Sequence, residues 1–110
     1  MAETLKRLGA TTVVATTPTT LYQVPSGKSA VVSNVVVCNR GSTDRTFRVA
    51  HVDGAIGSVA NEDYIAHDAP IEANGTVSLG LGITMTAGDS LLVYASHADV
   101  NFIAWGSEIT

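Results

Sequence analysis

The sequence predicts an all-β protein, a single antiparallel β-sandwich of about eight strands. Its composition leans to Val, Thr, Ala, Ser and Gly, and β-branched side chains fit a pleated sheet better than a helix. Short apolar-alternating runs recur along the chain, separated by Gly, Asn, Asp and Pro. With 110 residues, of which 45% are hydrophobic and 15% charged, the chain can bury one core. This balance argues against disorder and against a large barrel enzyme. Strand spacing leaves jelly-roll and immunoglobulin-like connectivity both open.

The N-terminal part, residues 1–19, is predicted to be an extended arm that includes the first strand, and residues 20–110 form the sandwich domain. We expect one helical turn over residues 3–8, ended by Gly9. Such a segment is too short to be a stable helix alone. A first strand follows over residues 11–16 and stops before Pro18.

The later strands are each bounded by turn residues, and residues 53–63 form the longest loop. Because only a six-residue connection, 39–44, separates the runs 29–39 and 46–52, we expect these two runs to form a hairpin. The predicted strands after the arm are 20–24, 29–39, 46–52, 64–67, 77–85, 91–95 and 102–105.

Alternation within these runs predicts which side chains share a face of the sheet. In residues 29–39, strict period two places Val31, Val35 and Val37 on one face and Val32 and Val36 on the other. Apolar residues on both faces indicate a central strand that is buried on both sides or that turns one side to another subunit.

Two further runs alternate in the same way. Residues 77–85 carry apolar side chains at strict period two. In residues 102–105, Phe102 and Ala104 face opposite to Ile103 and Trp105.

The charge balance excludes several partners. Six Lys and Arg residues against ten Asp and Glu residues give a net charge of −4, so no basic footprint for nucleic acid is present. No run approaches the ~18 consecutive apolar residues of a membrane span. The first residues carry both acidic and basic side chains and no apolar stretch, so we expect synthesis in a cytoplasm without a secretory signal.

No residue pattern predicts catalysis, a cofactor or a metal. Gly27-Lys28-Ser29 lacks the earlier glycine of a phosphate-binding loop, and Pro25 removes an amide donor from the would-be cradle. Glu62-Asp63 is a loop pair expected to be solvated. A small metal-dependent enzyme would need three dispersed histidines to meet at one point. These histidines are His51, His67 and His97.

Two residues could serve assembly. Cys38 is the only cysteine, so it is either a buried, inert thiol or half of an inter-subunit disulfide. Trp105 follows Phe102 and Ile103 and is interpreted as a core residue or a subunit contact.

Several stretches resemble a family of small, virion-associated proteins of tailed bacteriophages. Residues 20–33, TLYQVPSGKSAVVS, are similar to the family's "LYTVPAGK-AVVS" opening, and residues 36–50 contain its "VVCNR…TFRVA" segment. Residues 79–84, 93–96 and 106–110 resemble the remainder, and Lys6-Arg7-Leu8-Gly9 has its counterpart. The resemblance implies a β-sandwich building block of a phage particle, present in many copies, and it brings no catalytic motif.

The function expected from this reading is a non-enzymatic virion structural protein that packs on itself and on capsid, neck or tail proteins. Decoration, collar and adaptor roles all remain open. The candidate assembly contacts are Lys6, Arg7, Leu8, Tyr64 and Trp105. The alternative is a host-surface glycan-binding module of a tail or head fibre, with Tyr64 or Trp105 stacking on sugar.

Overall fold

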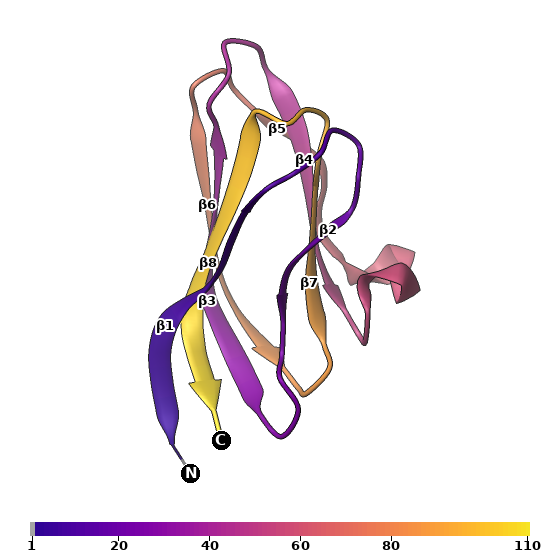
Figure 1. Ribbon diagram of the computed structural model, residues 1–110. Helices are drawn as coiled ribbons and strands as arrows, with labels where there is room; N and C mark the ends of the chain where they lie inside the picture. The colour runs from indigo at the N-terminus through magenta and orange to yellow at the C-terminus, as the bar shows by residue number, and fades with distance from the viewer. Residues whose placement is uncertain (1) are drawn as a thin grey trace.

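The computed structural model describes residues 2–110 as two packed four-stranded antiparallel sheets, which confirms the predicted β-sandwich (Figure 1). We call the sheet with strand order β1-β8-β3-β6 sheet A and the sheet with order β2-β7-β4-β5 sheet B. The strands are β1 (Glu3–Thr12), β2 (Thr19–Gln23), β3 (Ser29–Asn39), β4 (Arg45–Val52), β5 (Tyr64–Ile71), β6 (Thr76–Met85), β7 (Ser90–Ala95) and β8 (Val100–Ile109).

The connectivity is that of a jelly roll. Successive strands alternate between the two sheets, and only β4 and β5 are neighbours both in sequence and in one sheet. This order, two Greek keys of eight strands, distinguishes a jelly roll from an immunoglobulin-like sandwich. The predicted hairpin of residues 29–39 with 46–52 is therefore wrong, because β3 belongs to sheet A and β4 to sheet B. The connection between them crosses the sandwich instead of turning back in one sheet.

The N-terminal segment is a strand, and the helical turn predicted over residues 3–8 is wrong. β1 pairs with β8 from Glu3 opposite Ile109 to Thr12 opposite Asn101. The chain ends also meet, since the amide of Thr110 donates to the carbonyl of Ala2 at 2.9 Å. Residues 3–12 are thus the edge strand of sheet A (Figure 1).

The core lies between the sheets and is dominated by Val, Leu, Phe and Ala side chains. Phe47 of β4 meets Phe102 of β8 edge to face, with ring centroids 6.4 Å apart. Phe102 and Ala104 are buried and Trp105 is exposed, so Trp105 faces opposite to the other two, as the alternation predicted. Trp105 is therefore not a core residue.

A line of irregularities crosses sheet A and changes which residues face inward. The register of β3 shifts between Val32 and Asn34, so Val32 is buried together with Val35 and Val37. Strict period two had placed Val32 on the opposite face, and that assignment is wrong. A β-bulge adds one residue to a strand and reverses the faces beyond it. The register of β1 shifts at the same level, between Arg7 and Gly9.

A small second cluster covers the outer face of sheet B. The loop after β4 contains two short 3-10 turns, Ile56–Ser58 and Asn61–Asp63. Ile56 and Val59 of this loop pack with Tyr64 and Tyr94 on buried Ala50, Val52 and Leu92. The 53–63 loop is therefore a cover for its own sheet.

β5 and β8 extend several residues beyond their predicted bounds. β5 continues through Pro70 to Ile71, because an edge strand of sheet B leaves one side without ladder hydrogen bonds and tolerates a proline. β8 extends from Val100 to Ile109, beyond the predicted 102–105.

We predict that Gly106→Ala destabilises the fold by about 1–3 kcal/mol, the usual cost of forcing atoms into a packed site. A Cβ at Gly106 would collide with the backbone carbonyl of Val31. Gly80→Ala is the matched control, because a Cβ there meets nothing within 4 Å. Urea unfolding of both variants measures the difference. Equal stability of the two variants would contradict the close approach of β3 and β8.

Candidate assembly surface

The outer face of sheet A carries exposed apolar side chains. Side chains on one face of a sheet alternate with those of the other, so the residues between buried Phe102 and Ala104 and beyond them point outward. Trp105 is 40% exposed, and Leu5 on β1 is 79% exposed. Partly buried Ile103, Val31 and Val36 lie on the same face. We call this set of five residues the outer apolar face.

Trp105 stands where the bulges of sheet A meet. It lies opposite Arg7 of β1 on one side and Asn34 of β3 on the other. The Asn34 side chain is held by the hydroxyl of Ser78, which donates to Oδ1 at 3.0 Å. Bulges in natural sheets commonly re-aim a side chain, and here both neighbouring strands shift register beside the indole.

The predicted contacts Lys6, Arg7 and Leu8 differ in their surroundings although they are consecutive. Arg7 is exposed beside Trp105. Leu8 packs against the core of its own sandwich and is not available as an outward contact. The ammonium of Lys6 is 3.2 Å from Oε1 of Glu108. Of the predicted contacts, the structure therefore brings two together on the surface, Arg7 and Trp105.

Tyr64 lies on sheet B and does not join Trp105. It packs on the cluster under the 53–63 loop and meets the ring of His67 edge to face, with centroids 4.9 Å apart. Nearby, the guanidinium of Arg48 stacks over Tyr94 at 4.3 Å and binds Asp68 through two hydrogen bonds of 2.7 and 3.1 Å. This hydrogen bonding holds the pKa of Asp68 below its usual value.

Cys38 is a free, partly buried thiol on β3, opposite Asn101 of β8 and Thr76 of β6. Its position on the strand places it on the same face as Val36, the face that Trp105 shares. An inter-subunit disulfide through Cys38 stays a prediction.

A buried carboxylate joins the two ends of the chain. Glu108, whose side chain is 7% exposed, accepts a hydrogen bond of 2.6 Å from the Tyr22 hydroxyl through Oε2. Its Oε1 lies 3.2 Å from the Lys6 ammonium and 3.6 Å from that of Lys28. We call these four residues the Glu108 cluster. It ties β8 to β1, to β2 and to the turn before β3.

Electrostatics follow from this geometry. The hydrogen bond from Tyr22, helped by Lys6, lowers the pKa of Glu108 although burial opposes the shift. Burial, together with the hydrogen bond to Glu108, raises the pKa of the Tyr22 hydroxyl. Sequence reasoning missed this residue, although alternation from Phe102 through Ala104 and Gly106 places Glu108 on the inward face.

The three histidines pair with three different aspartates instead of meeting at one point. His51 lies 2.9 Å from Asp89, and His97 lies 3.2 Å from Asp99. His67 lies 3.6 Å from Asp68, its neighbour in sequence. Within residues 2–110 no group of three His, Cys, Asp or Glu side chains is placed to hold a metal ion. In the same residues, no helix is long and apolar enough to cross a membrane.

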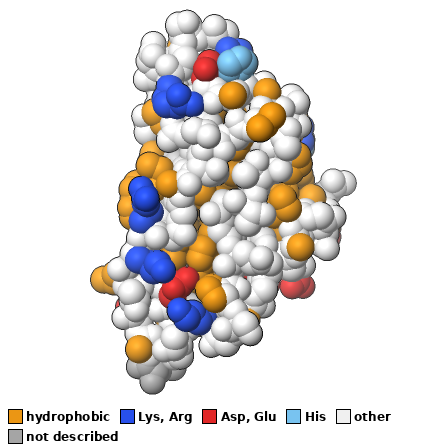
Figure 2. All heavy atoms as spheres, viewed as in Figure 1, with side chains coloured by type: hydrophobic (Ala, Val, Ile, Leu, Met, Phe, Trp, Pro, Cys, Tyr) orange, Lys and Arg blue, Asp and Glu red, His pale blue; other side chains and the backbone are white. Residues whose placement is uncertain are grey.

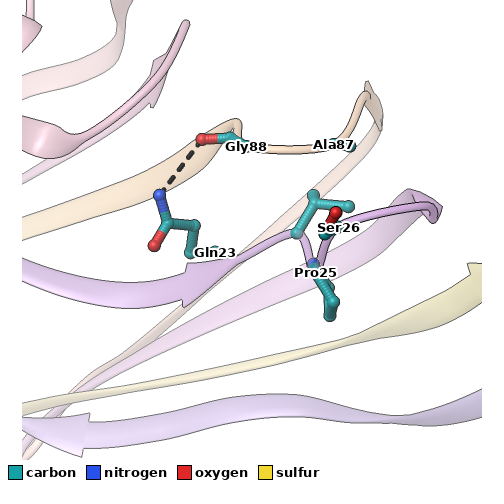
Figure 3. A pocket seen from close by; sticks show the side chains of 6 residues that line it. Gln23, Pro25, Ser26, Ala87 and Gly88 are labelled. Atoms are coloured by element: carbon teal, nitrogen blue, oxygen red, sulfur yellow. Dashed lines mark hydrogen bonds between the residues drawn. The ribbon is translucent and has the colours of Figure 1, made fainter.

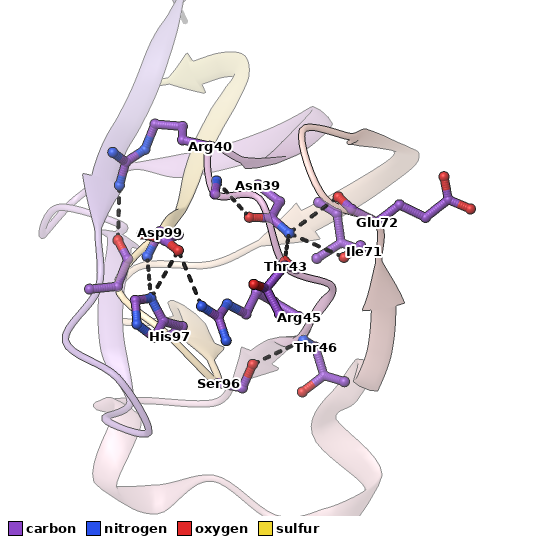
Figure 4. A network of polar contacts seen from close by, with 12 residues as sticks. Asn39, Arg40, Thr43, Arg45, Thr46, Ile71, Glu72, Ser96, His97 and Asp99 are labelled. Carbon is purple, nitrogen blue, oxygen red and sulfur yellow. Dashed lines mark hydrogen bonds and ion pairs between the residues drawn. The ribbon is translucent and has the colours of Figure 1, made fainter.

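A polar network organises the end of the sandwich where β3 leaves sheet A (Figure 4). Asn39 is fully buried and donates from Nδ2 to the carbonyls of Thr43, Ile71 and Glu72. Arg45 reaches Asp99 at 3.3 Å. These contacts satisfy the backbone of the crossing connection, so we assign the network to the fold.

The opposite end has an open depression between the 25–28 turn and the turn before β7 (Figure 3). Gln23 spans it and donates to the carbonyl of Gly88 at 3.2 Å. The other lining residues are Val24, Pro25, Ser26 and Ala87, and none of the six lining side chains is titratable.

Comparison with known proteins finds a likeness among solved structures. No protein-family model and no curated protein matches the chain. Among solved structures, the chain is similar to "a Pentameric Capsid Protein Isolated from Metagenomic Phage Sequences", with 20% identity and a TM-score of 0.38. The match covers 93% of this chain and 61% of that protein, so the chain spans less than two thirds of its length. At this TM-score the likeness does not establish a shared role.

We predict that Tyr22→Phe destabilises the protein by about 1.5–3 kcal/mol at pH 7, because it removes a hydrogen bond to a buried charged group. The pKa of Glu108 is lower in the folded state than in the unfolded chain. Its contribution to stability is therefore present above about pH 5 and is lost as the pH falls through the folded pKa. The difference in unfolding free energy between wild type and Tyr22→Phe should therefore become smaller as the pH falls over the same range.

Urea unfolding at pH 7 and at acidic pH measures this difference. Tyr94→Phe is the control, since the hydroxyl of Tyr94 forms no hydrogen bond with residues 2–110. A gap between Tyr22→Phe and wild type that widens as the pH falls would contradict the assignment.

Proposed function

We propose that this protein is a non-enzymatic structural subunit of a bacteriophage virion, present in many copies. In this role it packs on itself and on other virion proteins of the capsid, neck or tail, as a decoration, collar or adaptor component. The observation that carries the proposal is the outer apolar face. Tryptophan and arginine are enriched at the centres of protein interfaces, and Arg7 and Trp105 stand side by side on this face.

The low charge of the chain supports the same role. Only 15% of the residues are charged, and the large apolar side chains of Leu5 and Trp105 are exposed on sheet A. Contiguous exposed apolar surface on a soluble protein marks a site of interaction. Figure 2 shows hydrophobic side chains next to Lys and Arg side chains on the left of the view, where Figure 1 places β1 and β8.

Two arguments by analogy point in the same direction. The jelly roll occurs in viral capsid domains and in lectins, although a fold by itself does not determine function. The sequence motifs of residues 20–33 and 36–50 resemble small virion-associated phage proteins. Both arguments are compatible with several positions on the particle.

We predict that Trp105→Ala lowers incorporation of the protein into phage particles at least tenfold, the effect of losing an interface residue worth about 2 kcal/mol. Because the side chain points outward, the variant should fold normally. Ile65→Ala is the matched control, since Ile65 is 39% exposed on sheet B. Quantitative immunoblotting of purified particles measures incorporation. Normal incorporation of Trp105→Ala would overturn the role of this face.

A second candidate function, glycan binding at a host surface, is favoured by the outer face of sheet B. Arg48, Tyr64, Tyr94 and His67 gather there, and aromatic and charged side chains together suit sugar recognition. Since Tyr64 and Trp105 lie on different sheets, this site uses Tyr64 alone.

For this second candidate, we expect Tyr64→Ala to abolish binding to any glycan that the wild-type protein retains on an array. Trp105→Ala serves as the control and should bind as wild type does. An array on which the wild-type protein binds no glycan would exclude the candidate.

A further inference from the structure

The first strand leaves one edge of sheet A open. β1 is the terminal strand of the order β1-β8-β3-β6, and within residues 2–110 it pairs in the sheet with β8 alone. In Figure 1 the first half of β1, next to the N-terminus, has no strand on its side away from β8, whereas Gly9 in the second half lies against the backbone of Leu21 in β2. A strand edge presents a row of unpaired N–H and C=O groups that can pair with another chain.

The first half of β1 carries a distinctive pattern on this edge. Glu3, Leu5 and Arg7 alternate with Thr4 and Lys6, so they share one face, which is the face of Trp105. Leu5 is the most exposed large hydrophobic residue in residues 2–110. Within the same residues, neither Glu3 nor Arg7 takes part in an ion pair.

The opposite face of the same segment is already engaged. Lys6 points to the Glu108 cluster, where its ammonium is 3.2 Å from the carboxylate. This contact and the β8 ladder hold β1 in place before any partner arrives. Binding along the open edge therefore requires little further ordering of the strand, and the entropy cost of association is reduced.

We propose that a second copy of this chain pairs its β1 antiparallel to this edge, about a twofold axis at Leu5. This inference rests on the proposed function and names the surface through which copies associate. In this register Glu3 of each copy lies opposite Arg7 of the other, and the two Leu5 side chains lie opposite each other. The interface is isologous, as a twofold axis demands.

Several antiparallel registers keep the outer faces of the two copies on the same side, and the charges on β1 favour this one. A twofold axis at Glu3 would bring two carboxylates together, and an axis at Arg7 would bring two guanidinium groups together. Axes at Thr4 or Lys6 place Leu5 opposite a charged residue. Only the axis at Leu5 places opposite charges across from each other on both sides, and such cross-strand pairs stabilise a sheet.

The paired copies also combine their apolar surfaces. The axis is perpendicular to the sheet, so the two outer apolar faces lie on the same side of one continuous eight-stranded sheet. Arg7 then lies between Trp105 of its own copy and Glu3 of the second copy. Two tryptophans on one surface would give other virion proteins a larger docking area than one subunit offers.

Charge reversal tests the pairing directly. The full-length protein is studied by analytical ultracentrifugation over a range of concentrations. Wild type should form a dimer whose dissociation constant rises with salt. Glu3→Arg and Arg7→Glu should each raise that constant about tenfold or more, because both cross-strand pairs become repulsive.

Complementation makes the test specific. The double variant Glu3→Arg/Arg7→Glu should dimerise as wild type does, since its pairs are only exchanged. An equimolar mixture of the two single variants should form heterodimers, because every Arg then faces a Glu. Glu62→Arg, on the exposed loop over sheet B, is the control for the charge change and should dimerise normally. Thermal unfolding verifies that each variant is folded.

Two outcomes would overturn the inference. A wild-type protein that stays monomeric at all concentrations excludes pairing with a second copy. A dimer that tolerates both single reversals, or single variants that fail to complement each other, excludes the β1 edge. Neither outcome decides whether the protein is a virion subunit, which the incorporation of Trp105→Ala tests separately.

Discussion

The position of β8 between β1 and β3 is the constraint on which the rest of the structure depends. β8 is paired along both edges, and without it β1 would have no partner in the sheet. Its inward residues supply Phe102 to the core and Glu108 to the buried cluster, while its outward Trp105 forms the centre of the candidate surface. A single strand near the C-terminus therefore fixes the N-terminal strand, the core and the surface together. A change in its register by one residue would exchange every one of these roles.

Local alternation predicted much of the fold, and it failed where the deciding contacts are distant in sequence. The strand 29–39 was predicted with the bounds that β3 has, and Phe102 faces opposite to Trp105 as expected. Residues 3–8 were predicted to be a helical turn ended by Gly9, and the spacings of Leu5 to Leu8 and of Glu3 to Arg7 do suit one helix face. Glu3, Leu5 and Arg7 equally suit one strand face, and only pairing with β8, about a hundred residues away in sequence, decides between the two. The apolar pattern does not indicate the bulge near Ser33, so the faces of Val31 and Val32 could not be assigned correctly.

The candidate site was predictable only in part, for the same physical reason. Arg7 and Trp105 were each identified from residue type, but their adjacency follows from strand register. Alternation could have placed Glu108 inside the sandwich, where a carboxylate needs compensating partners. Its partners Lys6 and Tyr22 are 102 and 86 residues away, so no local pattern points to them. Tyr64 was grouped with Trp105 because both are aromatic, and the sandwich separates them onto different sheets.

Charged residues on an edge strand normally prevent indiscriminate pairing with other chains. One of the charged residues of β1, Lys6, forms an ion pair with Glu108 and therefore no longer opposes pairing at the edge. The remaining two, Glu3 and Arg7, have opposite signs and flank the exposed Leu5. If an unrelated strand paired with β1, at least one of these two charged residues would face an apolar or like-charged residue. Pairing with such a strand is therefore disfavoured. Against its own copy in one register, both charges are compensated and the leucine is covered. The same residues that protect the edge from most partners thereby select one, and specificity arises here from repulsion as much as from attraction.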